Sequence, residues 1–235
     1  MKTPIHLLIS LYQLSDLRRE SEILFCLRKN LDNIYVSKII VLNEGFTNPM
    51  LFEQKIQQIT INKRPTYRDF IPYMEAGAIN IISNADIWFD HTLESLKKLR
   101  WHRKLMYVLT RREKNGRLFN VNGNSHDSWI FLGRPKALEL ADFYLGIPNC
   151  EQRLAAVMND CGYYVLNPSK FIKTWHEHSS SHRAYHETWE KYEGCCLLVK
   201  PVGKFEIELL YAVFWYLKRK KYFYRRFNAK NDFID

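Results

Sequence analysis

The chain has 235 residues, of which 46% are hydrophobic and 14% aromatic. That is enough to fill one large domain, or a domain with an appendage, and it excludes wholesale disorder. The formal net charge of +10 favours anionic partners such as nucleotide phosphates, nucleic acid or acidic lipid, without choosing among them.

The cysteine pattern indicates a reducing compartment. The chain has five cysteines, an odd number, with no CxxC pair, and its length makes disulfides unnecessary. The longest apolar run, 209–217, falls far below the ~20 residues needed to cross a bilayer. We therefore expect a cytoplasmic protein, either free or peripheral on the inner face of the membrane.

The first 110 residues alternate between apolar runs and helical patterns. In chain order we expect a strand at 5–11, a helix at 17–28, strands at 36–42 and 56–61, a helix at 66–76, a strand at 79–83, a helix at 91–99 and a strand at 105–109. This alternation predicts an α/β fold with a mostly parallel central sheet and helices on both faces. The turn after the first strand has no glycine, so the dinucleotide fingerprint is absent.

The second half of the chain continues the alternation of strands and helices and then becomes rich in aromatic and basic residues. We expect a strand at 128–131, a helix at 150–160 and a strand at 163–165. The segment 205–227 is rich in aromatic and basic residues, and half of the net charge (+5, nine basic minus four acidic residues) lies from residue 200 onward. It predicts a helix that either lies on an anionic membrane surface or packs on the sheet with solvated lysines.

Polar clusters follow the predicted strands. Asn84-Ala85-Asp86 comes directly after the apolar run 79–83, and a buried strand that ends in a carboxylate is how open α/β sheets present a ligand-binding residue. Alternatively, Asp86 caps the helix that begins near Asp90. Three further clusters are Ser125-His126-Asp127, 150–153 and His176-Glu177-His178. Together they suggest a divalent metal, a phosphorylated donor and a carboxylate base, and hence a transferase.

Several of these stretches, in their order and spacing, resemble the small GT-A-type, nucleotide-sugar-dependent glycosyltransferases, in particular a small-domain group that includes a chlorella-virus glycosyltransferase. They are 84–90, 125–131, 145–154 and 162–168, followed by His176-Glu177-His178. The resemblance implies a single GT-A (Rossmann-like) domain at 1–190, with a nucleotide-binding half at 1–110 and an acceptor half at 111–190. A basic, aromatic helical extension at 191–235 follows.

The resemblance also implies a site for Mn²⁺ or Mg²⁺ built on an Asp-x-Asp triplet that faces the donor diphosphate. The first position here is Asn84, so only Asp86 keeps the charge. Hard divalent cations accept one or two protein carboxylates plus phosphate oxygens, so the site can still work. Asn84 is then expected to bond the ribose or a metal-bound water, and His178, or else His176, to complete the site. A rival hypothesis is a zinc cluster formed by His178, His182 and His186.

Inverting glycosyl transfer needs a carboxylate base near the acceptor hydroxyl. By the resemblance this base lies at the start of a helix, which selects Glu151, with Asp127 as the competing base or an acceptor anchor. A helix N-terminus stabilises an ionised acid, so we expect the pKa of Glu151 to be low. The alternative role of Glu151 is that of an ordinary first-turn acid.

Donor contacts are expected at the strand ends. Leu11 and Tyr12 would cover the nucleotide base and Asn43 would hydrogen-bond it. The candidates for contact with the base or the diphosphate are Arg64, Tyr67 and Arg68, and the candidates for neutralising the leaving diphosphate are Arg183 and Tyr185. We expect a nucleotide-diphosphate sugar as donor, UDP-sugar by preference, and a glycan or lipid-linked acceptor. The alternatives are an inactive homologue that acts as a binding subunit and a nucleic-acid-binding module. The module is disfavoured because the charge is concentrated in the tail rather than spread along a groove.

Overall fold

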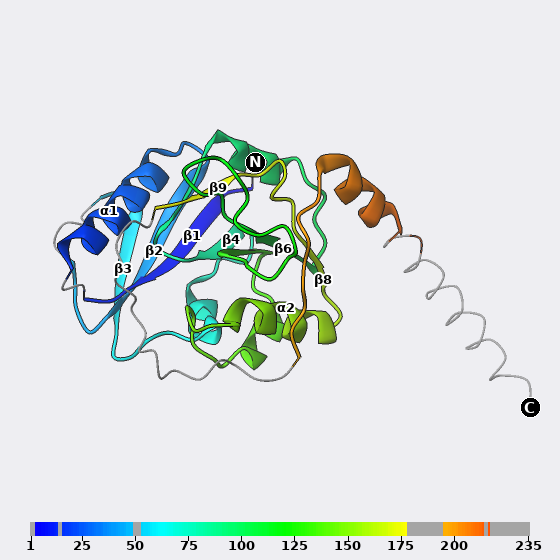
Figure 1. The fold of residues 1–235 in the computed structure, drawn as a ribbon. Coiled ribbons are helices and arrows are strands. Elements are labelled where there is room, and N and C mark those ends of the chain that lie inside the picture. Colours follow the sequence, from blue (N-terminus) through cyan, green and yellow to red (C-terminus); the bar gives the residue numbers. More distant parts are fainter. Residues whose placement is uncertain (1–2, 14–15, 49–52, 178–194, 214–215, 217–235) are drawn as a thin grey trace, which may run out of the picture.

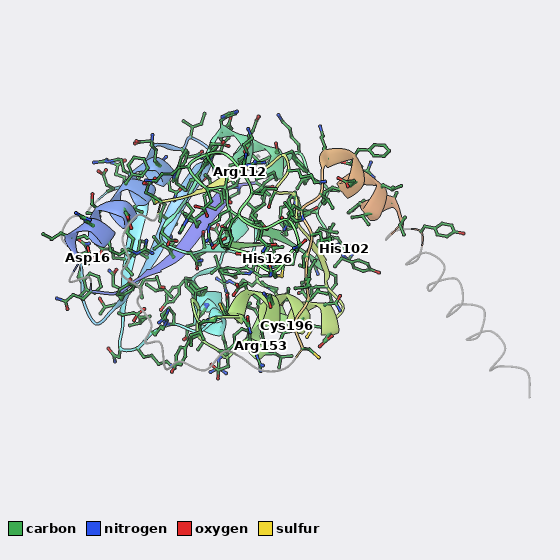
Figure 2. All side chains as sticks on the ribbon, in the orientation of Figure 1. Asp16, His102, Arg112, His126, Arg153 and Cys196 are labelled. Atoms are coloured by element: carbon green, nitrogen blue, oxygen red, sulfur yellow. The ribbon has the colours of Figure 1, made fainter. Side chains whose placement is uncertain are left out.

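The computed structural model describes residues 3–13, 16–48, 53–177, 195–213 and 216. Its centre is a seven-stranded sheet with the strand order β3-β2-β1-β4-β7-β6-β8 (Figure 1). The strands are β1 (Ile5–Leu11), β2 (Val36–Glu44), β3 (Ile56–Ile61), β4 (Ile79–Ser83), β6 (Leu105–Leu109), β7 (Ser128–Leu132) and β8 (Tyr164–Leu166). All run in one direction except β7, which is antiparallel to both of its neighbours. The predicted α/β class and mostly parallel sheet are confirmed.

A second, two-stranded sheet stands beside the carboxyl end of β4. It pairs β5 (Ile87–Phe89) with β9 (Thr174–His176) in antiparallel register, with Ile87 opposite His176. Neither strand was predicted as such, because three residues are too few to show an alternating pattern. The pairing places His176 next to the turn that carries Asp86.

Two of the predicted helices are shorter and tighter than the sequence pattern suggests. Within the described residues up to 177, the α-helices are α1 (Leu17–Asp32) and α2 (Cys150–Asp160), and the bounds of α2 are those predicted. The expected helices at 66–76 and 91–99 are instead the short 3₁₀ helices η1 (Tyr67–Tyr73) and η2 (His91–Lys97), and η3 (Lys136–Leu140) was not predicted. Pro72 lies inside η1, where it removes a backbone donor and prevents a longer α-helix.

Helices cover both faces of the sheet, as expected. Successive residues of β1 point to opposite faces, so Leu7 packs in the cluster that contains α1 and η2, whereas Leu8 packs in the cluster that contains η1, η3 and α2. Figure 1 shows α1 and α2 on opposite sides of the sheet. Two hydrophobic layers therefore enclose the strands and hold their carboxyl ends in fixed positions.

The described part of the C-terminal extension packs against the domain before it projects from it. The Val199 N–H donates to Gly123 O at 2.9 Å. Gly123 has a φ of 85°, and a Cβ there would lie 2.5 Å from the Val199 carbonyl carbon, so this crossing requires glycine. Residues 204–213 then form a helix, shown in orange in Figure 1. The expected domain boundary near residue 190 lies outside the described residues.

The helix at 204–213 has two unlike faces. Ile207 and Tyr211 are 2% and 7% exposed, whereas Phe205 and Leu209 are 80% and 55% exposed. Ile207 and Tyr211 lie one turn apart on one side, and Phe205 and Leu209 lie one turn apart on the other. The helix is thus attached along one side and apolar on its open side. In the described part of the chain, no helix has the length and apolar character to span a bilayer.

Candidate active site

A cleft of about 400 Å³ opens at the edge of the sheet where the parallel strands end. Tyr12 follows β1, Asp86 follows β4 and Arg111 follows β6, and all three line it. Because β7 runs the opposite way, the residue that precedes it, Asp127, lies at the same edge and also lines the cleft. The start of α2 completes the wall with Glu151. The fold therefore gathers the polar residues that the sequence pattern singled out.

Asp86 connects three parts of the fold, namely the turn between β4 and β5, helix α1 and strand β9. It lies in the turn between β4 and β5, is 8% exposed, and its Oδ2 accepts a hydrogen bond from Arg19 Nη2 at 2.5 Å. The same oxygen is 3.2 Å from His176 Nε2. The alternative role of Asp86 as a helix cap is wrong, because Asp90 caps η2 by accepting from the Thr92 N–H at 2.8 Å.

Asp86 and His176 have the chemistry of a partial site for a hard divalent cation. The carboxylate oxygen suits Mn²⁺ or Mg²⁺ when substrate oxygens fill the remaining positions, whereas the imidazole nitrogen is a ligand that softer divalent ions prefer. Among the described residues no group of three or more His, Cys, Asp or Glu side chains is arranged to hold a metal ion. The other expected ligand, His178, and the rival zinc histidines His182 and His186 lie outside the described residues. The described residues alone therefore form no complete metal site, and a cation held by Asp86 and His176 would need further oxygens from a bound donor.

Asp127 is buried beside the pair and is held in place by its neighbours. Its Oδ1 accepts from Arg111 Nη1 at 2.9 Å and from Asn84 Nδ2 at 3.2 Å. Its Oδ2 is buried without a hydrogen-bond partner among the described residues. Burial raises the pKa of Asp127, and the Arg111 guanidinium opposes the rise. Asp127 thus positions Asn84 and Arg111 through one of its two carboxylate oxygens.

The pKa of Glu151 is raised, whereas the sequence pattern predicts a low value. Burial raises its pKa to about 7, so desolvation outweighs the field of the helix N-terminus. Its Oε2 accepts a hydrogen bond from the Cys150 thiol at 3.5 Å, and that sulfur accepts from the Tyr67 hydroxyl at 3.3 Å. The expectation of a low pKa is therefore wrong. A carboxyl with a pKa near neutrality is suited to take up a proton during a reaction.

Three of the residues that were expected to contact the donor line a cavity. Tyr12 and Arg64 line the cleft, and Arg64 Nε donates to Leu145 O at 2.9 Å. Leu11 and Tyr12 line a smaller neighbouring hollow of about 230 Å³ together with Phe46. Tyr12 therefore stands between the two spaces.

Three other residues that were expected to contact the donor line neither cavity. Asn43 is fully buried and donates to Gln58 Oε1 at 2.8 Å, so it lines neither hollow. Tyr67 is also fully buried, with its ring against Trp129, and acts through Cys150 rather than by open contact. Arg68 pairs with Asp142 at 2.8 Å, away from the cleft. These three expectations require correction, because the side chains face the core or a different surface. Arg183 and Tyr185 lie outside the described residues.

The structure adds two arginines that the sequence pattern did not select. Arg19 enters the cleft from the first turn of α1, and Arg111 enters from the segment after β6. Arg111 follows a strand end by two residues, which is the same signal that identified Asp86. Arg19 had no comparable signal, because an arginine in an amphipathic helix is usually solvated.

The raised pKa of Glu151 predicts a pH-dependent stability. Its ordinary value is 4.5 and its folded value is about 7, so the folded protein binds the proton more tightly. The resulting stability is fully present below about pH 4.5 and is lost as the pH rises through about 7. Glu151→Gln should therefore gain free energy of unfolding relative to the wild type across this window, by up to about 1.4 kcal/mol per pH unit.

Urea denaturation at about pH 5 and about pH 8 measures this difference. The matched control is Glu139→Gln, in η3, because Glu139 is exposed. It should follow the wild type at both pH values. A Glu151→Gln variant that tracks the wild type equally well would show that the carboxyl is ionised and solvated when folded.

Comparisons with known proteins support the fold. No family model matches the chain, and no curated protein matches it in sequence. Among solved structures it is similar to a mannosyltransferase, PcManGT from Pyrobaculum calidifontis, solved with GDP-Man and Mn²⁺. The TM-score is 0.54 at 13% identity, over 75% of this chain and 57% of that one. It is also similar to S. aureus TarS (residues 1–349), solved with UDP, with a TM-score of 0.50 at 12% identity, over 74% of this chain and 60% of that one. The chain spans about three fifths of the length of these proteins, and at this identity the likeness establishes a shared GT-A-type fold.

Proposed function

We propose that this protein is a glycosyltransferase that moves a sugar from a nucleotide-diphosphate donor, UDP-sugar by preference, to a glycan or lipid-linked acceptor. We include in the proposal a requirement for Mn²⁺ or Mg²⁺, inversion at the anomeric carbon, and kinship with the chlorella-virus group. The observation that carries it is the convergence of Asp86, His176, Asp127 and Glu151 on one cleft at the carboxyl edge of the sheet. Ligands of open α/β sheets bind at this edge.

The donor would lie across the strand ends. Tyr12 separates the smaller hollow from the cleft, so the nucleotide base is assigned to the hollow beside Leu11 and the diphosphate to the cleft. Asp86 and His176 are the residues that would hold the metal ion. When bound, that ion would neutralise charge on the departing diphosphate. Arg64, which also lines the cleft, is a second source of positive charge for the diphosphate.

Glu151 is assigned as the base that removes the proton from the acceptor hydroxyl. Its pKa of about 7 leaves a substantial ionised fraction at neutral pH while giving it more basicity than a solvated carboxylate. Asp127 is less suited to that step, because Arg111 and Asn84 already bond to its Oδ1. We assign Asp127 instead to anchor the acceptor through its Oδ2, which has no hydrogen-bond partner among the described residues.

Asp86→Asn tests the donor site. The change keeps the shape of the side chain but removes the charge that a cation needs. In a thermal-shift panel, UDP, GDP and their sugars should raise the melting temperature of the wild type more with Mn²⁺ than with EDTA, because ligands that bind only the folded state stabilise it. In Asp86→Asn the Mn²⁺-dependent part of the shift should be lost.

The matched control is Asp160→Asn, because Asp160 is exposed at the end of α2. It should retain the full shift. A wild-type protein whose melting temperature responds to none of these nucleotides, with or without Mn²⁺, would contradict the proposed function.

Glu151→Gln tests the base. The variant should lower kcat by about 100-fold or more while changing the donor Kd by less than about threefold, because the interaction develops only in the transition state. Steady-state kinetics and donor titration measure the two quantities. Glu139→Gln again serves as the control. Full turnover in Glu151→Gln together with loss of turnover in Asp127→Asn would transfer the role of base to Asp127.

We further propose that the helix at 204–213 rests on an anionic membrane surface, which fits a lipid-linked acceptor. Phe205, Leu209, Leu210 and Val213 are between 43% and 80% exposed on this helix. The sequence beyond them contains the cations of 218–221 and of 225–226. An apolar face next to a run of cations is the combination that binds the headgroup layer of acidic lipid.

Paired substitution of Phe205 and Leu209 by Glu should weaken binding to phosphatidylserine-containing vesicles by about tenfold or more, because it removes apolar contact and adds like charge. Vesicle co-sedimentation measures this, with pure phosphatidylcholine vesicles as the neutral reference. Leu140→Glu is the matched control, because Leu140 is 66% exposed on η3. Equal binding of the paired variant and the wild type would show that this helix does not contact lipid.

A further inference from the structure

Arg19 bonds the carboxylate oxygen through which Asp86, together with His176, would hold a divalent cation. Its Nη2 is 2.5 Å from Asp86 Oδ2, the oxygen that is 3.2 Å from His176 Nε2. Arg19 is only 9% exposed, so the pair is shielded from water. The atom through which Asp86 would bind a metal ion together with His176 is therefore already bonded to a cation from α1.

The guanidinium and a metal ion cannot share this oxygen at low cost. Two positive charges in a partly desolvated cleft repel each other, because little water remains to screen them. A free metal ion would have to displace Arg19 from Asp86 without offering the guanidinium another anion. Metal binding to the donor-free protein is therefore opposed by the Arg19–Asp86 pair.

The surroundings of Arg19 allow it to change partners without leaving the cleft. Its Nη1 donates to Glu22 Oε2 at 3.1 Å, on the same helix. The hydroxyl of Tyr12, a residue that lines both hollows, also forms a hydrogen bond with Arg19. These contacts do not involve Asp86, so they can retain the guanidinium beside the space assigned to the diphosphate. Guanidinium groups bind phosphate oxygens strongly and in a directed way.

We propose that Arg19 couples metal binding to donor binding. In the donor-free protein it neutralises Asp86. When the nucleotide diphosphate enters, the guanidinium moves from Asp86 to a phosphate oxygen, and Asp86 and His176 become available to the metal ion that accompanies the donor. This inference rests on the proposed donor site. It predicts that a nucleoside diphosphate and Mn²⁺ each increase the affinity of the protein for the other, as linkage requires.

Electron paramagnetic resonance of free Mn²⁺ tests the coupling directly, without a turnover assay. The wild type should bind Mn²⁺ weakly alone and about tenfold or more tightly with UDP or GDP, after correction for the metal–nucleotide complex in solution. Arg19→Gln should bind Mn²⁺ alone about tenfold more tightly than the wild type, because the competing cation is gone. Its coupling should fall below about threefold, and its affinity for the nucleoside diphosphate with Mn²⁺ should also fall.

Arg18→Gln is the matched control, because Arg18 precedes Arg19 on α1 with its side chain exposed. It should keep the weak metal binding and the full coupling. Circular dichroism verifies the fold of each variant. If Arg19→Gln does not fold, Arg19→Lys replaces it as the test of the coupling. Its single, less directed ammonium should raise the affinity for Mn²⁺ alone by about threefold and lower the coupling.

The outcomes separate this inference from the proposed function. If the wild type binds a nucleoside diphosphate with Mn²⁺ but the folded Arg19 variants show the wild-type affinity for Mn²⁺ alone, Arg19 does not compete with the metal and the inference is overturned, while the donor site stands. If the wild type binds no nucleoside diphosphate with or without Mn²⁺, both are overturned.

Discussion

Two carboxylates buried at one end of the sheet are each neutralised by an arginine, and the arrangement of the site depends on this balance. Asp86 pairs with Arg19 at 2.5 Å and Asp127 pairs with Arg111 at 2.9 Å. A buried carboxylate without a partner would cost several kcal/mol. The arginines arrive from α1 and from the segment after β6, so the pairs also tie these elements to the strand ends. The cleft is therefore held in shape by charge as well as by packing.

Glu151 differs from these two carboxylates, and the difference separates their roles. At Asp127 an arginine directly bonded to the carboxylate opposes the effect of burial on the pKa. At Glu151 the bonded neighbour is the Cys150 thiol, a weak donor, and the pKa rises to about 7. A difference of this kind between neighbouring carboxyl groups is the physical basis for proposing Glu151 as the base and Asp127 as a fixed charge.

The reversed strand β7 explains how residues from both halves of the chain reach one cleft. In a fully parallel sheet the residue before a strand lies at the opposite edge from the residue after its neighbour. Because β7 is antiparallel to β4 and β6, Asp127 lies beside Asn84 and Arg111. The β5–β9 pairing then brings His176 to Asp86 from 90 residues further along the chain. The reversed strand β7 and the β5–β9 pairing, rather than any single motif, assemble the site.

The sequence by itself determined the strands of the seven-stranded sheet, the α/β class, the bounds of α2 and the placement of Asp86 at a strand end, because apolar periodicity and helix boundaries are local properties. It also selected Asp127, Glu151 and His176, which line the cleft. Only the tertiary structure decided that the helices expected at 66–76 and 91–99 are the shorter 3₁₀ helices η1 and η2, that Asn43 and Tyr67 face the core, and that Arg19 bonds Asp86. It also decided that burial, rather than the helix N-terminus, controls the pKa of Glu151. These outcomes depend on desolvation and on contacts between residues far apart in the chain, neither of which a local pattern contains.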